Sequence, residues 1–176
     1  MIISLEQAQA INLAITIEDL YAYEQAIRAL THNNFQDPNV RGQGLTLHGY
    51  TIQIDRGYTT GLKIGDTIEI NYTQFNDGIY TIKTLTPDTI EVNEGIFFNE
   101  ISQDAIVTKI SYPADIAKGV KKLIEYDVKM GSKVGIKSET ISRMSVTYYD
   151  VNSTENVDGY PAALLSFLKK YKKMRW

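Results

Sequence analysis

The sequence predicts an α+β protein: a small helical bundle with an inserted small antiparallel β-barrel or half-barrel. Apolar residues recur at helical spacing near both ends of the chain. Between them, over residues 45–110, apolar and polar residues alternate in short runs separated by turn residues. We therefore expect residues 1–44 and 111–176 to form a helical core with a C-terminal helix, and residues 45–110 to form an inserted β domain.

Two helix-start signatures lie near the N-terminus. Ser4 and Thr16 each place a hydroxyl three residues before a polar side chain, Gln7 and Asp19, as capping boxes do. After Thr16 the apolar spacing predicts an amphipathic helix over residues 17–32, which the Asn- and Pro-containing stretch after it should end.

The middle of the chain changes period. Runs rich in Ile, Thr and Tyr predict strands at residues 51–54, 67–72, 79–82, 89–92 and 105–110. Five or six short strands can hardly make a large sandwich. Closure into a barrel or half-barrel is the economical arrangement, because it removes exposed strand edges.

Helical spacing returns after the β domain. Pro113 sits where a first-turn proline belongs, and the pattern predicts a helix over residues 113–130. Residues 135–149 are expected to be extended. A last helix over residues 161–176 is expected to bury one face against the 113–130 helix, through Leu164, Leu165, Leu168 and Tyr171.

No pattern of catalytic residues emerges from the sequence. The chain has no Cys, and its two His, His32 and His48, lack the helical spacing of a metal pair. Solvated turns and strand faces explain the acidic residues of the β domain, Asp55, Asp66, Glu69, Asp88, Glu91 and Glu94. We therefore predict a soluble protein without an export signal that is not an enzyme, with no catalytic residues, no cofactor and no metal.

Charge is divided unevenly along the chain. The net charge of −3 combines a net of −8 over residues 1–110 (6 basic, 14 acidic) with +5 over residues 111–176 (12 basic, 7 acidic). Such asymmetry suits head-to-tail association, or a basic end that meets a polyanion or an acidic protein. A solvated helix end explains the terminal basic residues equally well.

Several segments of the third block carry a family resemblance. They are Gly135-Ile136-Lys137-Ser138-Glu139-Thr140-Ile141, Ser145-Val146-Thr147-Tyr148, Gly159-Tyr160-Pro161, and the Tyr171-Lys172-Lys173-Met174-Arg175 ending. In this order they resemble the head–tail connector (adaptor, or head-completion) proteins of tailed bacteriophages. The predicted helix 113–130 also resembles the long helix of that family, and residues 17–36 look like its N-terminal helix. The β insert is a departure, because the typical connector is nearly all helical.

The resemblance implies a structural protein of the virion neck, made in the host cytoplasm. Such a protein forms a ring, typically a dodecamer, that binds beneath the portal, extends the DNA channel and docks the stopper or tail-completion protein. Its partners would be the portal, the stopper and further copies of itself; DNA passes without sequence-specific contact, and no membrane is involved. The residues expected to reach the portal are those of the C-terminal tip: Lys169, Lys170, Lys172, Lys173, Arg175 and Trp176.

Two alternatives remain open at the level of the sequence. The nearest is a neck stopper or tail-completion protein. The other belongs to a different class, a small β-barrel module that binds a peptide, a glycan or a nucleic acid, with the helices as its scaffold. Tyr residues on the strands can stack nucleobases, but the acidic character of this block disfavours a nucleic-acid surface.

Overall fold

The computed structural model of the chain describes residues 1–56, 59–93, 95–131, 138–141, 144–147, 156–157 and 159–174. These residues fall into two compact units. The barrel unit comprises Met1 and residues 34–112, and the helical unit comprises residues 2–33 and 113–176.

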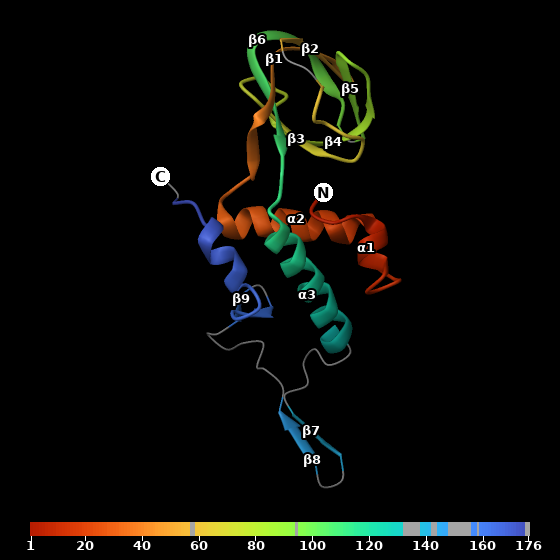
Figure 1. Cartoon of the computed structure of the whole chain (residues 1–176), viewed down its shortest axis with the longest axis vertical. Coiled ribbons are helices and arrows are strands. Elements are labelled where there is room, and N and C mark those ends of the chain that lie inside the picture. The colour runs from red at the N-terminus through yellow and green to blue at the C-terminus, as the bar shows by residue number, and fades with distance from the viewer. Residues whose placement is uncertain are drawn as a thin grey trace. The chain divides into compact units, whose positions relative to one another are not determined.

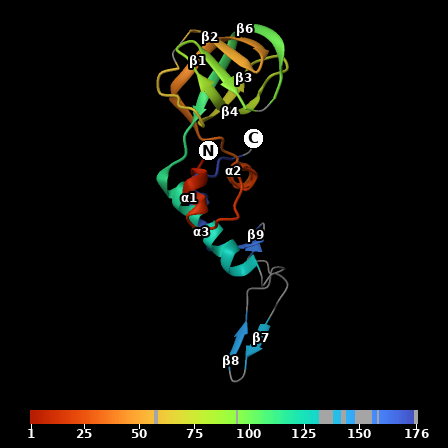
Figure 2. The same cartoon turned by 90° about the vertical axis from the view of Figure 1, so that its right-hand side faces the viewer.

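The barrel unit is a closed antiparallel barrel of six strands in the order β1-β2-β5-β4-β3-β6, with β6 returning to β1. Figure 1 shows these strands in orange to green, and Figure 2 shows the same barrel turned by 90°. The strands are β1 (Gln36–Gly49), β2 (Thr51–Arg56), β3 (Thr67–Asn71), β4 (Gly78–Leu85), β5 (Thr89–Val92) and β6 (Phe97–Ile110).

Side chains from all six strands fill the interior of the barrel. Alternation places every second residue inside, as expected for a strand with one buried face. The core is dominated by β-branched and Leu residues with Phe97, whose ring meets Tyr80 edge-on at 4.9 Å between centroids. The buried set is Leu45, Leu47, Ile52, Ile54, Ile68, Ile70, Ile82, Ile90, Val92, Phe97, Ala105 and Val107.

The barrel begins earlier than the sequence pattern predicts. Residues 36–44 were expected to lie outside the β domain, yet they form the first part of β1 and pair with the end of β6. A register shift between Asp37 and Arg41 accommodates Pro38, which a regular central strand would not tolerate because proline donates no ladder hydrogen bond. The Asp-Pro-Asn stretch therefore bends a strand instead of ending the ordered region.

Within the described residues, the helical unit contains one short α-helix and two longer ones. α1 (Leu5–Gln9) is capped by Ser4, whose hydroxyl accepts from Gln7 N. α2 (Ile17–Thr31) begins with the predicted capping box of Thr16 and Asp19, and ends at His32 in the left-handed region (φ 50°). α3 (Ala114–Met130) follows Pro113. These α2 and α3 bounds agree with the predicted helices to within one residue.

Two short strand pairs and a 3-10 helix follow α3 in the described part of the helical unit. β7 (Ser138–Ile141) and β8 (Met144–Thr147) form an antiparallel hairpin within the stretch expected to be extended. β9 (Asn156–Val157) pairs with β10 (Tyr160–Pro161). η2 (Ser166–Tyr171) is a 3-10 helix that packs against both α2 and α3.

The predicted fold class was therefore wrong. The protein is built mainly of strands around a closed six-stranded barrel, not as a helical bundle into which a barrel is inserted. Only α2 and α3 reach seven residues in the described ranges. The prediction assigned residues 36–44 to the helical part and the last sixteen residues to an α-helix, and both assignments exaggerated the helical content.

Close packing between α3 and η2 yields a first testable prediction. Gly119 lies on the buried face of α3 under the ring of Phe167, and an added Cβ would fall inside the van der Waals radius of that ring. Gly119→Ala should destabilise the helical unit by about 1–3 kcal/mol despite the better helix propensity of Ala. Thermal or urea unfolding measures this effect.

Two further variants separate overpacking from a general intolerance of substitution. Gly131→Ala is the matched control, because it sits at the end of α3 with open space around the new methyl. In a Phe167→Ala background, Gly119→Ala should become neutral or slightly stabilising. Equal destabilisation in both backgrounds would contradict the close Gly119–Phe167 contact.

Candidate functional site

The C-terminal segment, predicted to be the partner-binding tip, is built differently from the expected α-helix. Successive i→i+3 bonds join Leu164 N to Pro161 O and Leu168 N to Leu165 O, at 2.9 and 3.0 Å. This tighter winding places residues three apart on one face, and Leu165 and Leu168 are both buried. The expected packing towards α3 is present, and Phe167, which the prediction left out of the inner face, places its ring beside Gly119 of α3.

Tyr171 and Lys170 anchor this segment to the start of α3. The Tyr171 hydroxyl donates to Asp115 Oδ1 at 2.6 Å, and Lys170 Nζ lies 2.7 Å from Asp115 Oδ2. The bond from Lys170, followed by that from Tyr171, lowers the pKa of Asp115, and the same contact raises the pKa of Lys170. Lys170, which was predicted to belong to the partner-binding tip, therefore forms an ion pair with Asp115 within the helical unit, and its role in binding a partner stays a prediction.

The remaining tip residues differ in position. Lys169, Lys172 and Lys173 are exposed, whereas Arg175 and Trp176 lie outside the described residues. Two bonds hold the backbone here against the end of α2: Lys173 N donates to Thr31 O at 2.8 Å, and Asn33 Nδ2 donates to Tyr171 O at 3.3 Å.

An open hollow of about 460 Å³ lies beside these bonds. It is lined by His32, Lys172, Lys173 and Met174, and the Met174 side chain is 77% exposed. His32 ends α2, as its position in the sequence indicated. Its position beside the tip lysines was not predicted. We call these four residues the basic hollow. Its lysines suit an acidic partner, and its exposed thioether offers an apolar contact.

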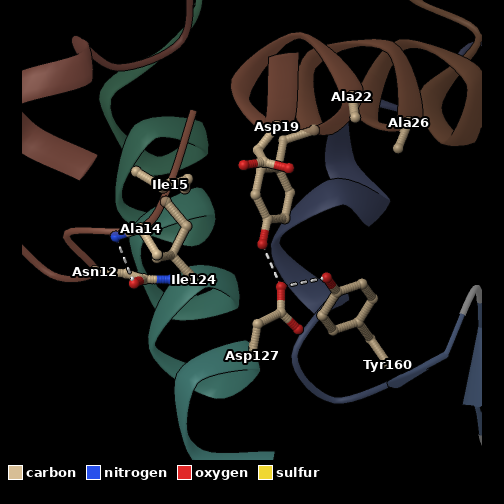
Figure 3. A pocket seen from close by; sticks show the side chains of 10 residues that line it. Asn12, Ala14, Ile15, Asp19, Ala22, Ala26, Ile124, Asp127 and Tyr160 are labelled. Carbon is tan, nitrogen blue, oxygen red and sulfur yellow. Dashed lines mark hydrogen bonds between the residues drawn. The ribbon is translucent and has the colours of Figure 1, made fainter. Parts of the chain in front are cut away.

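A second cavity, of about 420 Å³, lies within the helical unit between α2 and α3. Figure 3 shows Asp127 of α3 facing two tyrosines across this cavity. Tyr23 donates to Asp127 Oδ2, and Tyr160 donates to the same oxygen at 2.7 Å. Burial, followed by the bond to Asp127, raises the pKa of both phenols above their ordinary range, so both remain protonated donors at neutral pH.

The rest of this cavity is mainly apolar, with small alanine side chains from α2 and the loop before it. Asp19 and Asn12 supply the other polar groups, but Asp19 is used by the Thr16 cap and Asn12 Oδ1 accepts from Ala14 N at 3.1 Å. No metal-binding cluster of three or more His, Asp or Glu occurs within the residues described. The Tyr23–Asp127–Tyr160 network thus fastens the 160 region to the two main helices.

Sequence reasoning missed this network because its bonded partners are 104 residues apart (Tyr23 and Asp127) and 33 residues apart (Asp127 and Tyr160). Tyr160 entered only as part of the Gly-Tyr-Pro motif, and Tyr23 only as a member of a helix face. A signal was available in the polar Tyr23 on an otherwise apolar face, since a buried phenol usually finds a hydrogen-bond partner.

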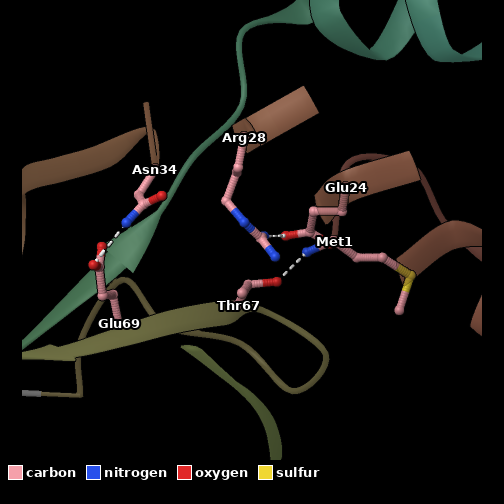
Figure 4. Close-up of polar contacts among 6 residues, drawn as sticks. All are labelled: Met1, Glu24, Arg28, Asn34, Thr67 and Glu69. Carbon is pink, nitrogen blue, oxygen red and sulfur yellow. Dashed lines mark hydrogen bonds and ion pairs between the residues drawn. The ribbon is translucent and has the colours of Figure 1, made fainter. Parts of the chain in front are cut away.

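Among the described residues, two carboxylates are buried, and each has a partner inside its own unit (Figure 4). Glu24 in the helical unit is 2% exposed and pairs with Arg28 at 2.8 Å. Glu69 in the barrel unit is 8% exposed and accepts from Asn34 Nδ2 at 2.8 Å and Gln36 Nε2 at 2.9 Å. Glu69 was expected to be solvated, and the early start of the barrel, which brings Gln36 beside it, explains the difference.

The Tyr23–Asp127–Tyr160 network predicts a measurable contribution to stability. Asp127→Ala removes the acceptor of two phenol hydroxyls and should destabilise the helical unit by about 2–4 kcal/mol, because hydrogen bonds to charged groups contribute about 1.5–3 kcal/mol each and are not additive. The matched control is Glu125→Ala, an exposed carboxylate on the same helix. If urea unfolding finds the two variants equally stable, the network is not structural.

Comparison with known proteins adds no relative. No protein-family model matches the sequence, and no curated protein matches it either.

No helix in the described part of the chain is long and apolar enough to cross a membrane.

Proposed function

We propose that this protein is a structural head–tail connector of a tailed bacteriophage, which assembles as a ring under the portal. The order of elements in the helical unit carries the proposal. A 15-residue helix, a 17-residue helix, the β7–β8 hairpin, the Tyr160–Pro161 segment and a basic C-terminal segment follow one another in the order that the resemblance implies, although the last element is a short 3-10 helix instead of the expected terminal α-helix. The resemblance and this element order support each other.

The site geometry also suits a connector better than a catalyst. Glu69 and the cavity carboxylate Asp127 accept hydrogen bonds from side chains of other segments of the chain, and Glu24 pairs with Arg28 one turn along the same helix. In the basic hollow, the exposed side chains are two lysines and a methionine on a backbone held by hydrogen bonds, which suits docking to another protein. The portal above and a stopper or tail-completion protein below are the proposed partners, and the virion neck is the proposed location.

A salt-dependent association with the portal tests this proposal. The barrel unit carries a net charge of −5 (5 basic, 10 acidic) and the helical unit +2 (13 basic, 11 acidic), so charge should steer subunits together. Sedimentation of the protein with cognate portal should show co-sedimentation at low salt that weakens at high salt, because exposed charges are screened beyond about 10 Å at 0.1 M. Persistent monomers at saturating portal and low salt would exclude a connector role.

A further inference from the structure

The barrel unit exposes a pair of phenylalanine rings that its own fold does not use. Phe75 lies in the loop between β3 and β4 and is 67% exposed, and Phe98 lies at the start of β6 and is 68% exposed. Their rings meet with centroids 5.8 Å apart. Tyr72, 70% exposed, belongs to the same loop. Clustered aromatic rings of this kind on a soluble domain mark an interaction site more often than scattered single residues do.

Hydrogen bonds hold the pair in place although solvent surrounds it. The Asn76 side chain, 3% exposed, accepts from Phe98 N at 2.9 Å and donates to Phe98 O at 3.0 Å. Glu100 accepts from Gln74 N and from Asn76 Nδ2, both at 2.8 Å. The loop is thereby fixed to β6 on both sides of Phe75. A partner would meet preorganised rings and would not have to order a flexible loop.

The stretch of chain that carries the pair is acidic and poor in cations. Between residues 64 and 108 the only basic residue is Lys83, which pairs with Glu91 at 2.7 Å. Eight acidic residues lie in the same stretch; Glu69 is buried, Asp66 and Glu91 pair with Lys109 and Lys83, and the others are Asp77, Asp88, Glu94, Glu100 and Asp104. Asp77 and Glu100 belong to the loop and strand that carry the rings. This combination repels nucleic acid and favours a cationic, partly apolar protein segment, because ammonium groups are attracted to aromatic faces.

The same chain carries a surface of that chemistry. In the basic hollow, the Met174 side chain offers an apolar contact beside Lys172 and Lys173. The hydrogen bond from Lys173 N to Thr31 O holds the backbone there. A methionine thioether packs favourably on aromatic rings, and Lys172 and Lys173 would face the carboxylates beside Phe75 and Phe98. The two surfaces are complementary in charge and in apolar contact.

We propose that the basic hollow of one copy docks on the Phe75–Phe98 pair of a second copy. Because the two surfaces differ, the contact is heterologous and can repeat from copy to copy until a ring closes. This proposal rests on the proposed function, because a ring is the assembly that the connector would form. It assigns the C-terminal segment to the neighbouring subunit. The portal, which the sequence suggested for this segment, becomes the competing occupant.

Two full-length variants and their mixture test the contact. Phe75→Ser with Phe98→Ser removes the rings, and Lys172→Glu, Lys173→Glu with Met174→Ser removes the docking segment. All five residues lie at exposed positions, so circular dichroism should show both variants folded. Ile64→Ser is the matched control, since Ile64 is 69% exposed in the same unit but outside the ring-bearing loop and β6.

In sedimentation velocity at low salt, the wild type and Ile64→Ser should self-associate with increasing concentration. Each of the two docking variants should associate at least tenfold more weakly. Their mixture should form one-to-one dimers and nothing longer, because each variant retains one of the two surfaces. A peptide of residues 169–176 should compete with wild-type association, and the same peptide with its lysines replaced by glutamate should not.

Other outcomes overturn the proposal or separate it from the connector function. A monomeric wild type, or a mixture that stays monomeric, contradicts docking between copies. If the lysine variant self-associates normally but no longer binds the portal, the segment serves the portal and the proposal is wrong, while the connector function stands. If self-association follows the predicted pattern but portal is never bound, docking between copies is supported and the connector function fails.

Discussion

A chain in which residues 36–110 are replaced by a short Gly/Ser linker is expected to keep its helical circular dichroism and to melt cooperatively. Gln36 and Ile110 are paired across β1 and β6, and Ser111 N donates to Phe35 O at 2.9 Å. The two ends of the barrel therefore lie side by side, and a short linker can span them. Domains inserted at adjacent chain ends are usually tolerated and removable.

The excised barrel unit tests the same division of the chain from the other side. Residues 34–112 alone should give a β-rich spectrum and a single melting transition, because the barrel closes on its own core. Excising only residues 45–110 is the matched control. It leaves the first part of β1 without its β6 partner and should yield a less stable product. Loss of the helical signal when residues 36–110 are removed would show that the two units share one core.

Removing residues 172–176 should abolish attachment to the portal or to a neighbouring subunit while leaving the melting temperature almost unchanged. The truncated chain keeps the bond from Tyr171 to Asp115 and the buried Leu165 and Leu168. It loses the Lys173–Thr31 backbone bond, which contributes only about 1 kcal/mol.

Tyr171→Phe is the matched control for this truncation, because it loosens the anchor on α3 without removing any charge. It should lower the melting temperature slightly and leave attachment largely intact. Co-sedimentation with portal and analytical sedimentation of the protein alone measure the two effects. Normal assembly of the truncated chain would move the docking surface elsewhere, first to α2.

Local patterns in the sequence predicted the individual elements well. The Thr16–Asp19 capping box and 3.6-residue spacing located α2, and two-residue alternation located five of the six barrel strands, because both signals depend only on near neighbours. The boundaries of the barrel could not be predicted in this way. Pro38 normally ends a strand, and only pairing with β6, some 70 residues away, shows that a register shift tolerates it.

The site was predicted less completely, for a related reason. The lysines of the C-terminal segment were visible as a charge run, but Asp115, which holds Lys170, is 55 residues distant. The pairing of Phe75 with Phe98 depends on the hydrogen bonds of Asn76, which no local pattern announces. Long-range side-chain contacts therefore decide which basic or aromatic residues remain available to a partner.

Electron microscopy of the protein mixed with its cognate portal at low salt tests the connector proposal most directly. The account predicts a second ring stacked coaxially on the portal, with density for one barrel per subunit and a continuous central channel. Ring formation should weaken as salt is raised, because the complementary surfaces are charged. Portal rings without added density at saturating protein, in a sample whose protein is folded, would contradict the account.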